Sequence, residues 1–369
     1  MIEVEAYCST LLERDPRMTG SVSSRWCHRR WRPCLALAAL AAVLAAAGCS
    51  SPSPKVRPPE PVTLRLGYLS ELADAPALAG LEMGFIGSGA GDVNVDAVPF
   101  TSPVAEARAL AQGRLDAAYI DPVLAVAVWE SAGDGGIKVI AGSASGGTEL
   151  VAKKGITSAA QLAGQRVAAP AGTAGEAALD WWLRQNGIGA DSPGDATMTG
   201  TYLAHAISHG QLAAAWEPAP LDAQMAAAGG QVLVNEASLW PGGEFATAVL
   251  AVTSKFLAAH PTQVTGLLQG DMEAVRYLDT DPSPAHAAAA KQLTEVVRTE
   301  LPATVLAAGF TQLQFTVDPL AGTMFAEAQH AAAAAMVRPV PSLRAMAGLF
   351  DLGPLNQLLK ATRQPLVNL

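Results

Sequence analysis

The chain has 369 residues and a formal net charge of -9, with 50% hydrophobic and 15% charged residues. This composition excludes a disordered protein, and the length suits two domains or one two-lobed unit. Beyond residue 48 the chain holds 18 Lys and Arg against 29 Asp and Glu. A body this acidic, without a basic stripe among aromatic residues, excludes nucleic acid as an expected partner.

The first 48 residues have the layout of a secretory signal. A basic cluster at 25–32 precedes an apolar run at 34–47, which is too short to span a bilayer and ends in small residues. Cleavage is expected before Cys49, and the Ser- and Pro-rich stretch 49–61 is expected to be a tether. Residues 1–17 are acidic and fit no signal, so Met18 is an alternative start. No cysteine follows Cys49, so the body has no disulfide.

Beyond the tether, short apolar runs alternate with helical segments, which predicts an α/β fold. Strands are expected at 62–68, 93–99, 117–120, 137–142, 148–152, 166–169 and 245–253, and helices at 76–83 and 103–112. The small residues at 143–147 suggest a loop between two strands. A capping box from Thr173 to Glu176 opens a further helix that ends near Asn186.

Several strings occur in a characteristic order: "VIAGSASGGTELV" at 139–151, "GITSAAQLAGQRVAAPAGTAG" at 155–175, "AAWEPAP" at 214–220 and "LWPGGEFAT" at 239–247. With Gly67-Tyr68 and Ala75-Pro76-Ala77, these strings resemble the substrate-binding proteins of sulfonate, nitrate and taurine importers, which are related to thiamine-precursor binding proteins. The last string favours the aliphatic-sulfonate branch. The Ala-Ala-Gly-Cys ending at 46–49 likewise resembles the lipobox of bacterial lipoproteins, which implies a lipid anchor at Cys49.

The resemblance implies a two-lobed α/β fold of the type II periplasmic-binding-protein class, with crossing strands near 150–153 and 247–251. Residues 62–152 and 248–369 would form the first lobe and residues 153–247 the second. The protein would be a monomeric lipoprotein on the outer face of the membrane, capturing a small organic anion and delivering it to the permease subunits of an ABC importer. A thiamine-precursor or other amine-bearing ligand, and a sensing partner of a membrane receptor, remain alternatives.

The expected ligand-binding residues follow strands, because α/β folds bind ligands at the carboxyl ends of their strands. They are Tyr68, Asp74, Tyr119, Asp121, Ser143, Ser145, Gly146, Gly147, Thr148, Thr173, Ala174, Gly175, Trp216 and Glu217. The N–H groups of Thr173, Ala174 and Gly175 at a helix start would hold a sulfonate or carboxylate. For Thr173 a plain N-cap is the alternative, and for Trp216 a place in the core.

Asp74 and Asp121 depart from the pattern of this family, which often has His and Gly at these places. Two carboxylates would oppose an anionic ligand, so one hypothesis is a ligand that also carries an amine or another cationic group. The alternative is that each aspartate caps the helix that follows it. The sequence leaves both open.

No enzyme, metal site or cofactor is expected. The string "GSASG" at 142–146 has Ala144 where a nucleophile elbow needs serine, and "GSGAGD" at 87–92 precedes a strand instead of following one. His205 and His209 have the spacing of two metal ligands on one helix face, but the sequence places no third ligand beside them. A solvated helix face is the favoured interpretation.

Overall fold

The computed structural model describes residues 62–88, 93–132, 136–188, 193–194, 200–340 and 342–369. All of them belong to one compact unit, Pro59–Leu369. The expected signal, Met18, Cys49 and the tether lie outside the described residues. None of the described helices has the length and hydropathy of a membrane span.

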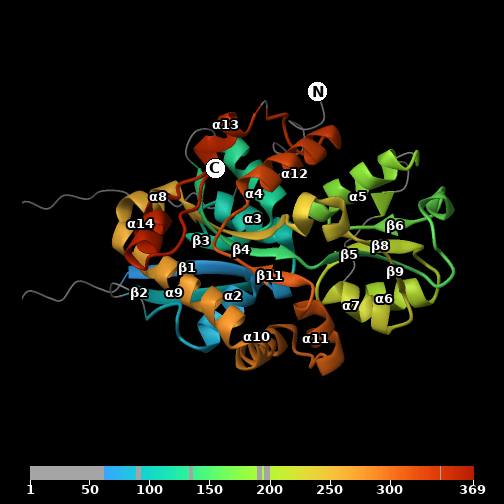
Figure 1. Ribbon diagram of the computed structural model, residues 1–369, viewed down its shortest axis with the longest axis horizontal. Coiled ribbons are helices and arrows are strands. Elements are labelled where there is room, and N and C mark those ends of the chain that lie inside the picture. Colours follow the sequence, from blue (N-terminus) through green and yellow to red (C-terminus); the bar gives the residue numbers. More distant parts are fainter. Residues whose placement is uncertain (1–61, 89–92, 133–135, 189–192, 195–199, 341) are drawn as a thin grey trace, which may run out of the picture. The chain divides into compact units, whose positions relative to one another are not determined.

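A six-stranded sheet forms the larger lobe, in the order β11-β4-β10-β3-β1-β2 (Figure 1). Strands β1, β2 and β3 are parallel, whereas β10 runs antiparallel between β3 and β4, and β11 is antiparallel to β4. The strands are β1 (Val62–Leu69), β2 (Val93–Phe100), β3 (Ala117–Ile120), β4 (Ile137–Gly146), β10 (Ala246–Thr253) and β11 (Leu313–Phe315).

Helices enclose this sheet, and the whole of β3 is buried, as expected for a strand with both faces covered. The helices are α2 (Ala75–Glu82), α3 (Pro103–Ala111), α4 (Pro122–Ser131), α8 (Ser254–Ala259), α9 (Pro261–Thr280), α10 (Pro282–Val297), α11 (Ala303–Phe310), α12 (Ala321–Ala333), α13 (Leu343–Met346) and α14 (Gly353–Ala361). Two short 3-10 turns, η1 (Leu72–Asp74) and η5 (Ala347–Leu349), complete the lobe. One hydrophobic core runs through it.

The smaller lobe is built on a five-stranded sheet in the order β7-β6-β8-β5-β9. Its strands are β5 (Thr148–Ala152), β6 (Val167–Ala168), β7 (Pro193–Gly194), β8 (Ala214–Pro218) and β9 (Gln231–Asn235). Helix α5 (Ala174–Gln185) packs on one face, and α6 (Gly200–Ser208) and α7 (Leu221–Ala227) pack on the other, each face with its own hydrophobic cluster. The turns are η2 (Ala159–Leu162), η3 (Glu236–Leu239) and η4 (Pro241–Gly243). The α/β two-lobed fold expected from the sequence is confirmed.

The chain passes between the sheets earlier than expected. Strand β5 was expected in the first lobe but pairs with β8 and β9 of the smaller sheet, so the crossing lies between Gly146 and Thr148 instead of near 150–153. The expected loop at 143–147 is also wrong for most of its length, because β10 and β11 extend β4 to Gly146 by pairing on both sides of it. The return occurs just before Ala246, where β10 begins.

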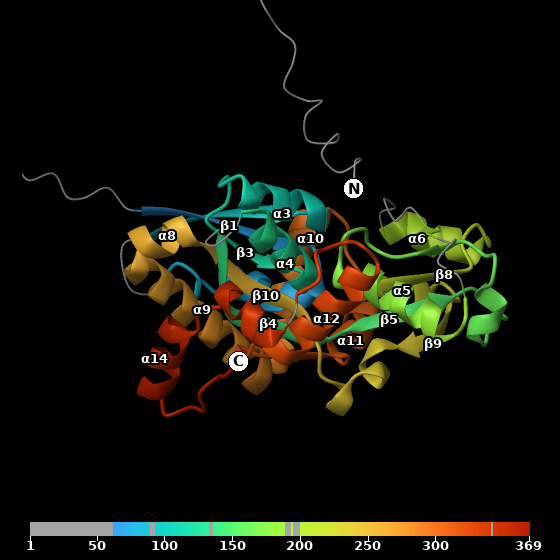
Figure 2. The ribbon, with the colours of Figure 1, turned by 90° about the horizontal axis from the view of Figure 1, so that it is seen from above.

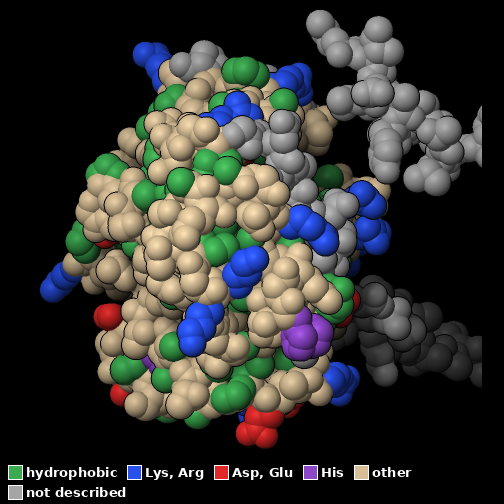
Figure 3. All heavy atoms as spheres, turned by 90° about the vertical axis from the view of Figure 1, so that its right-hand side faces the viewer, with side chains coloured by type: hydrophobic (Ala, Val, Ile, Leu, Met, Phe, Trp, Pro, Cys, Tyr) green, Lys and Arg blue, Asp and Glu red, His purple; other side chains and the backbone are tan. Residues whose placement is uncertain are grey.

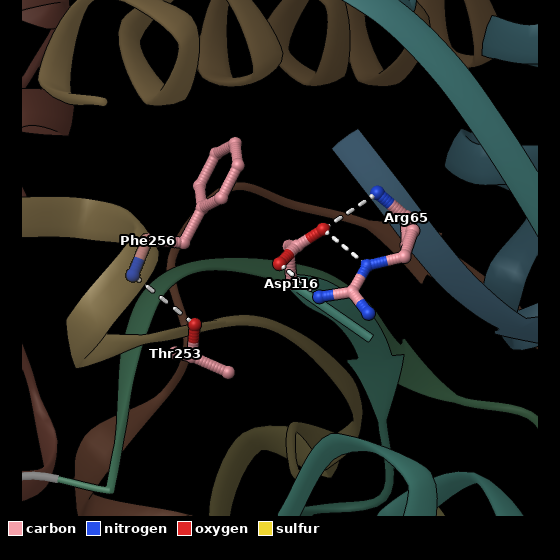
Figure 4. A network of polar contacts seen from close by, with 4 residues as sticks. All are labelled: Arg65, Asp116, Thr253 and Phe256. Carbon is pink, nitrogen blue, oxygen red and sulfur yellow. Dashed lines mark hydrogen bonds and ion pairs between the residues drawn. The ribbon is translucent and has the colours of Figure 1, made fainter. Parts of the chain in front are cut away.

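Polar contacts fix the end of the larger sheet where β3 begins (Figure 4). Arg65 in β1 donates from its backbone N and from Nε to Oδ2 of Asp116, at 3.0 and 2.8 Å, and from Nη2 to Oδ1 at 2.6 Å. Thr253, at the end of β10, donates its N–H to the Asp116 carbonyl at 2.8 Å and accepts from the N–H of Phe256 at 3.2 Å. These contacts hold the amino end of β3. The carboxyl ends of β1 and β3, at Leu69 and Ile120, lie at the other edge of the sheet, on the side of the smaller lobe.

Candidate functional site

A cavity of about 40 Å³ lies where the carboxyl ends of β1 and β3 face the crossing segments and the smaller lobe. Both lobes contribute to its wall. Its lining residues are Leu69, Glu71, Asp74, Pro103, Asp121, Thr148, Pro170, Thr173, Ala174, Gly175, Pro218, Glu236, Phe245, Ala246, Thr247 and Ala248. The sequence had placed six of them there: Asp74, Asp121, Thr148, Thr173, Ala174 and Gly175.

Asp121 spans the two lobes. It follows β3, and its Oδ1 accepts from the N–H of Leu124 at 3.0 Å. Asp121 therefore caps α4, as the helix-capping hypothesis expected. Its Oδ2 accepts from the N–H of Ala174, at the start of α5 in the other lobe, at 2.9 Å. A single carboxylate therefore caps the start of α4 and also binds the start of α5, where the helix dipole is positive.

Asp74 does not cap the helix that follows it. It precedes α2, but its side chain makes no capping hydrogen bond there. Instead Oδ2 accepts from the N–H of Leu69 at 2.5 Å, which turns the carboxylate back toward the end of β1 and the cavity. The capping hypothesis for this residue is wrong.

Thr173 is the N-cap of α5 and also lines the cavity. Its Oγ1 accepts from the N–H of Glu176 at 3.4 Å and donates to the Pro170 carbonyl at 2.6 Å. The Glu176 carboxylate accepts from the N–H of Gly172 at 2.6 Å. The first bond of the expected capping box therefore forms, whereas the Glu176 carboxylate binds the N–H of Gly172 instead of that of Thr173.

The remaining expected residues do not line the cavity. Tyr68, Tyr119, Ser143, Ser145 and Trp216 are buried behind it, Glu217 is 2% exposed, and Gly146 and Gly147 form the crossing. Tyr119 donates to Oδ1 of Asp271 in the core at 2.8 Å.

Two of these buried residues support the cavity wall instead. The hydroxyl of Ser143 donates to the Ala73 carbonyl at 2.9 Å, beside Asp74. The indole N–H of Trp216 donates to Oε2 of Glu236 at 2.8 Å. The core alternative weighed for Trp216 is thus the one observed, and its polar atom positions a lining carboxylate.

Sequence reasoning missed Glu71 and Glu236. Glu71 comes just after β1 and Glu236 directly after β9, so the rule that ligands lie beyond the carboxyl ends of strands would have found both. The N–H groups of Trp216 and Trp240 hold the Glu236 carboxylate, the second at 3.2 Å from Oε1.

The lining is acidic: it contains four carboxylates and none of its residues is Lys, Arg or His. Burial, helped by the nearby Asp121, raises the pKa of Glu71 to about 7. Burial raises the pKa of Asp121 to about 6 against the lowering effect of its backbone hydrogen bonds, and that of Glu236 to about 7 against its two indole donors. Burial and Glu71 raise the pKa of Asp74 well above its usual range.

Aromatic stacking and a backbone hydrogen bond also join the lobes. Helix α12 of the larger lobe lies beside α5 of the smaller lobe (Figure 2). His330 of α12 stacks on Trp181 of α5 with ring centroids 4.7 Å apart, and its ring lies 5.7 Å from that of Trp240. The N–H of Leu72 donates to the Ala219 carbonyl at 2.9 Å. The cavity is therefore closed on more than one side by contacts between the lobes.

His205 in α6 and His209, the residue after its end, are exposed and stack with ring centroids 3.8 Å apart. No group of three or more His, Cys, Asp or Glu side chains with the geometry of a metal site occurs among the described residues. The face of the smaller lobe drawn in Figure 3 carries separate Lys and Arg side chains instead of a continuous basic stripe. Neither the histidine pair nor these basic side chains therefore indicate a binding site besides the cavity.

Solved structures with this fold include solute-binding proteins. Nitrate-binding NrtA from Synechocystis PCC 6803 is 14% identical, with a TM-score of 0.70 over 83% of this chain and 90% of its own. Alkanesulfonate-binding SsuA from Xanthomonas axonopodis pv. citri is 18% identical (TM-score 0.63, 78% and 98%), and aliphatic sulphonate-binding SsuA from Escherichia coli is 19% identical (0.62, 77% and 91%). At these identities the likeness shows the fold alone.

A search of curated proteins finds none that matches this chain. The model of the NMT1-like family matches residues 57–294, more than half of the sequence, including β1 to β10 and all the lining residues of the cavity. The chain therefore belongs to the NMT1-like family.

Proposed function

We propose that the protein is the extracytoplasmic solute-binding component of an ABC importer and that it binds a small organic solute without chemical change. The observation that carries this proposal is the cavity between the two lobes, whose wall both lobes supply. The fold shared with sulfonate- and nitrate-binding proteins supports it. The lining offers carboxylates, threonine hydroxyls and backbone groups, with no Ser, Cys or His nucleophile among its residues.

Binding would be coupled to closure of the lobes. A ligand shifts a conformational equilibrium only by its difference in affinity between the two states, so it must touch both lobes to favour the closed one. Glu71 and Asp121 offer contacts from the larger lobe, and Thr173 and Glu236 from the smaller. The crossings at 146–148 and just before Ala246 would serve as the hinge.

The proposal also includes the export signal and the lipid anchor expected from the sequence. Acylation at Cys49 would hold the protein on the outer face of the membrane, and the tether 49–61 would leave the lobes free to reach permease subunits. The working unit would be a monomer. Mass spectrometry of the membrane fraction tests the anchor: a mature N-terminus at acylated Cys49 is expected, and an unmodified N-terminus elsewhere would contradict it.

A thermal-shift screen of the chain from Ser50 onward tests the receptor function. The shortened chain retains the whole compact unit Pro59–Leu369. The screen should include alkanesulfonates, taurine, nitrate, thiamine precursors, other amines and neutral solutes. A ligand at a hundred times its Kd adds about 2.7 kcal/mol and raises Tm by several degrees. If no compound and no small-molecule extract of the source cells stabilises the protein, the receptor function is wrong.

A further inference from the structure

We propose that the cavity binds a positively charged group, a primary ammonium on the solute, and that Asp121 excludes anions by occupying the helix start where an anion would bind. This inference rests on the proposed receptor function and names the chemical class of the ligand. It chooses the amine-bearing alternative over the organic anion. The reasons lie in the hydrogen bonds and charges of the cavity wall.

Two carboxylates of the larger lobe have oxygens open to a ligand. Glu71 lines the cavity, and neither oxygen of its carboxylate accepts a hydrogen bond from the described residues. Asp74 is 1% exposed, and only its Oδ2 has a donor within the described chain, so Oδ1 is left without one. An ammonium group has three N–H donors and a full charge, and carboxylates bind such groups with short, strong hydrogen bonds.

The other two lining carboxylates have neutral partners only. Asp121 accepts from two backbone N–H groups, and Glu236 accepts from two indole N–H groups. Neutral donors orient a carboxylate without cancelling its charge, and a buried charge without a counter-ion is costly. A cation between the lobes would supply the missing charge to both.

Further buried carboxylates surround the wall. Glu106 and Glu327 are buried, at 0% and 2% exposure, and neither carboxylate has a hydrogen-bond partner among the described residues. The Oε1 atom of buried Glu217 also has no partner there. Burial, together with Asp74 and Glu71, raises the pKa of Glu106 well above its usual range. Burial, together with Glu236 and Asp121, does the same for Glu327. Any fraction of these groups that ionises makes the cavity more attractive to cations and less so to anions.

A carboxylate of the protein already occupies part of the anion site expected from the sequence. The N–H groups at the start of a helix attract anions. Of the three expected donors, the N–H of Ala174 donates to Oδ2 of Asp121 at 2.9 Å, and the N–H of Thr173 donates to the Pro170 carbonyl at 3.4 Å. A sulfonate would have to displace a carboxylate of the protein and remain beside it, which like-charge repulsion opposes.

Titration calorimetry on the chain from Ser50 onward at pH 8, with matched probes, tests the charge class. Propylamine and putrescine carry the ammonium, propanesulfonate has the same carbon chain as propylamine but the opposite charge, and propanol is neutral. We expect binding of at least one amine and none of propanesulfonate. Glu71→Gln and Asp74→Asn should each weaken amine binding by about tenfold or more, because each removes a carboxylate that pairs with the bound ammonium. The exposed Glu300→Gln is the matched control and should change nothing.

Asp121→Ser tests the exclusion of anions. Serine retains an N-cap oxygen for α4 but is too short to reach Ala174, so the start of α5 becomes available. The variant should bind amines more weakly, and the ratio of its propanesulfonate affinity to its amine affinity should rise by about tenfold or more. Asp351→Ser, which removes a carboxylate that accepts from Gly353 outside the cavity, should leave the ratio unchanged.

The outcomes separate the two proposals. The charge inference would be overturned if propanesulfonate, propanol or another uncharged or anionic solute binds and no amine does. The receptor function would then still hold. Amine binding that survives both Glu71→Gln and Asp74→Asn unchanged would also overturn it. If the folded protein binds nothing in the wider screen, the receptor function fails and the charge inference fails with it.

Discussion

At the scale of single residues, Asp121 shows why the sequence left two alternatives open. A helix cap and a cavity carboxylate are different roles, but a carboxylate has two oxygens, and here Oδ1 caps α4 while Oδ2 reaches α5. The second partner, Ala174, is distant in the sequence, so no local pattern could reveal it. For Asp74 the local pattern was misleading, because the nearest donor is the N–H of Leu69 and not the helix that follows.

Tyr68 and Tyr119 provide a test of the site at this scale. Tyr119→Phe removes the donor to Oδ1 of Asp271, whose Oδ2 has no partner among the described residues, and should cost about 1–3 kcal/mol of unfolding free energy. Tyr68→Phe removes only a 3.4 Å contact with Gln292 and should cost less than about 0.5 kcal/mol. Urea unfolding measures both effects.

Neither tyrosine lines the cavity, so neither variant should alter ligand affinity by more than about twofold once the protein is folded. A loss of affinity in Tyr68→Phe or Tyr119→Phe of the size expected for Glu71→Gln would return these residues to the binding site, where the sequence had placed them. Calorimetry with the best ligand of the screen decides this.

At the scale of elements, β7, β8, β9 and β11 were not predicted, but six of the seven strands expected from the sequence and the start of α5 agree with the structure within one or two residues. These elements are marked locally, by apolar runs and by caps such as Ser102, whose side chain accepts from Ala105 in α3. The end of β4 was missed because small residues look like a loop, and only pairing with β10 and β11, far along the chain, makes them a strand. Glu71 and Glu236 could have been found, since the same positional rule applies to them.

The crossing itself gives a prediction at this scale. Gly147 has φ +75, and a Cβ there would lie 2.4 Å from the side chain of Leu313, so Gly147→Ala suffers both backbone strain and a clash. Gly187, behind α5, has φ +70 with nothing within 4 Å of a Cβ. Gly187→Ala should cost about 1 kcal/mol and Gly147→Ala clearly more, about 2–4 kcal/mol in urea unfolding. Equal costs would show that the crossing is not packed as described.

At the scale of the whole molecule, buried carboxylates should set the pH dependence of stability. Burial raises the pKa of Glu71, Glu236, Asp222 and Asp271 to about 7. A carboxyl with a raised pKa binds more protons folded than unfolded, so its stabilising contribution is complete below about pH 4 and is lost as the pH rises through 7. The unfolding free energy of the ligand-free protein should therefore fall from pH 5 to pH 8, by more than about 1 kcal/mol.

Glu71→Gln should reduce that slope, because it removes one of the titrating groups, whereas the exposed Glu300→Gln should not change it. Urea unfolding at pH 5, 6, 7 and 8 gives the slopes. A stability that rises over this range would show that the carboxylates are ionised and compensated in the ligand-free protein.

The most direct test of a receptor that binds an ammonium between its lobes is calorimetric titration of the best amine near pH 6.5, in two buffers with different ionisation enthalpies. One site per chain and a heat that differs between the buffers are expected, because a cation beside Glu71 and Asp121 lowers pKa values near 7 and 6 and so releases protons. Binding with no proton release, or no binding of any amine, would contradict the account.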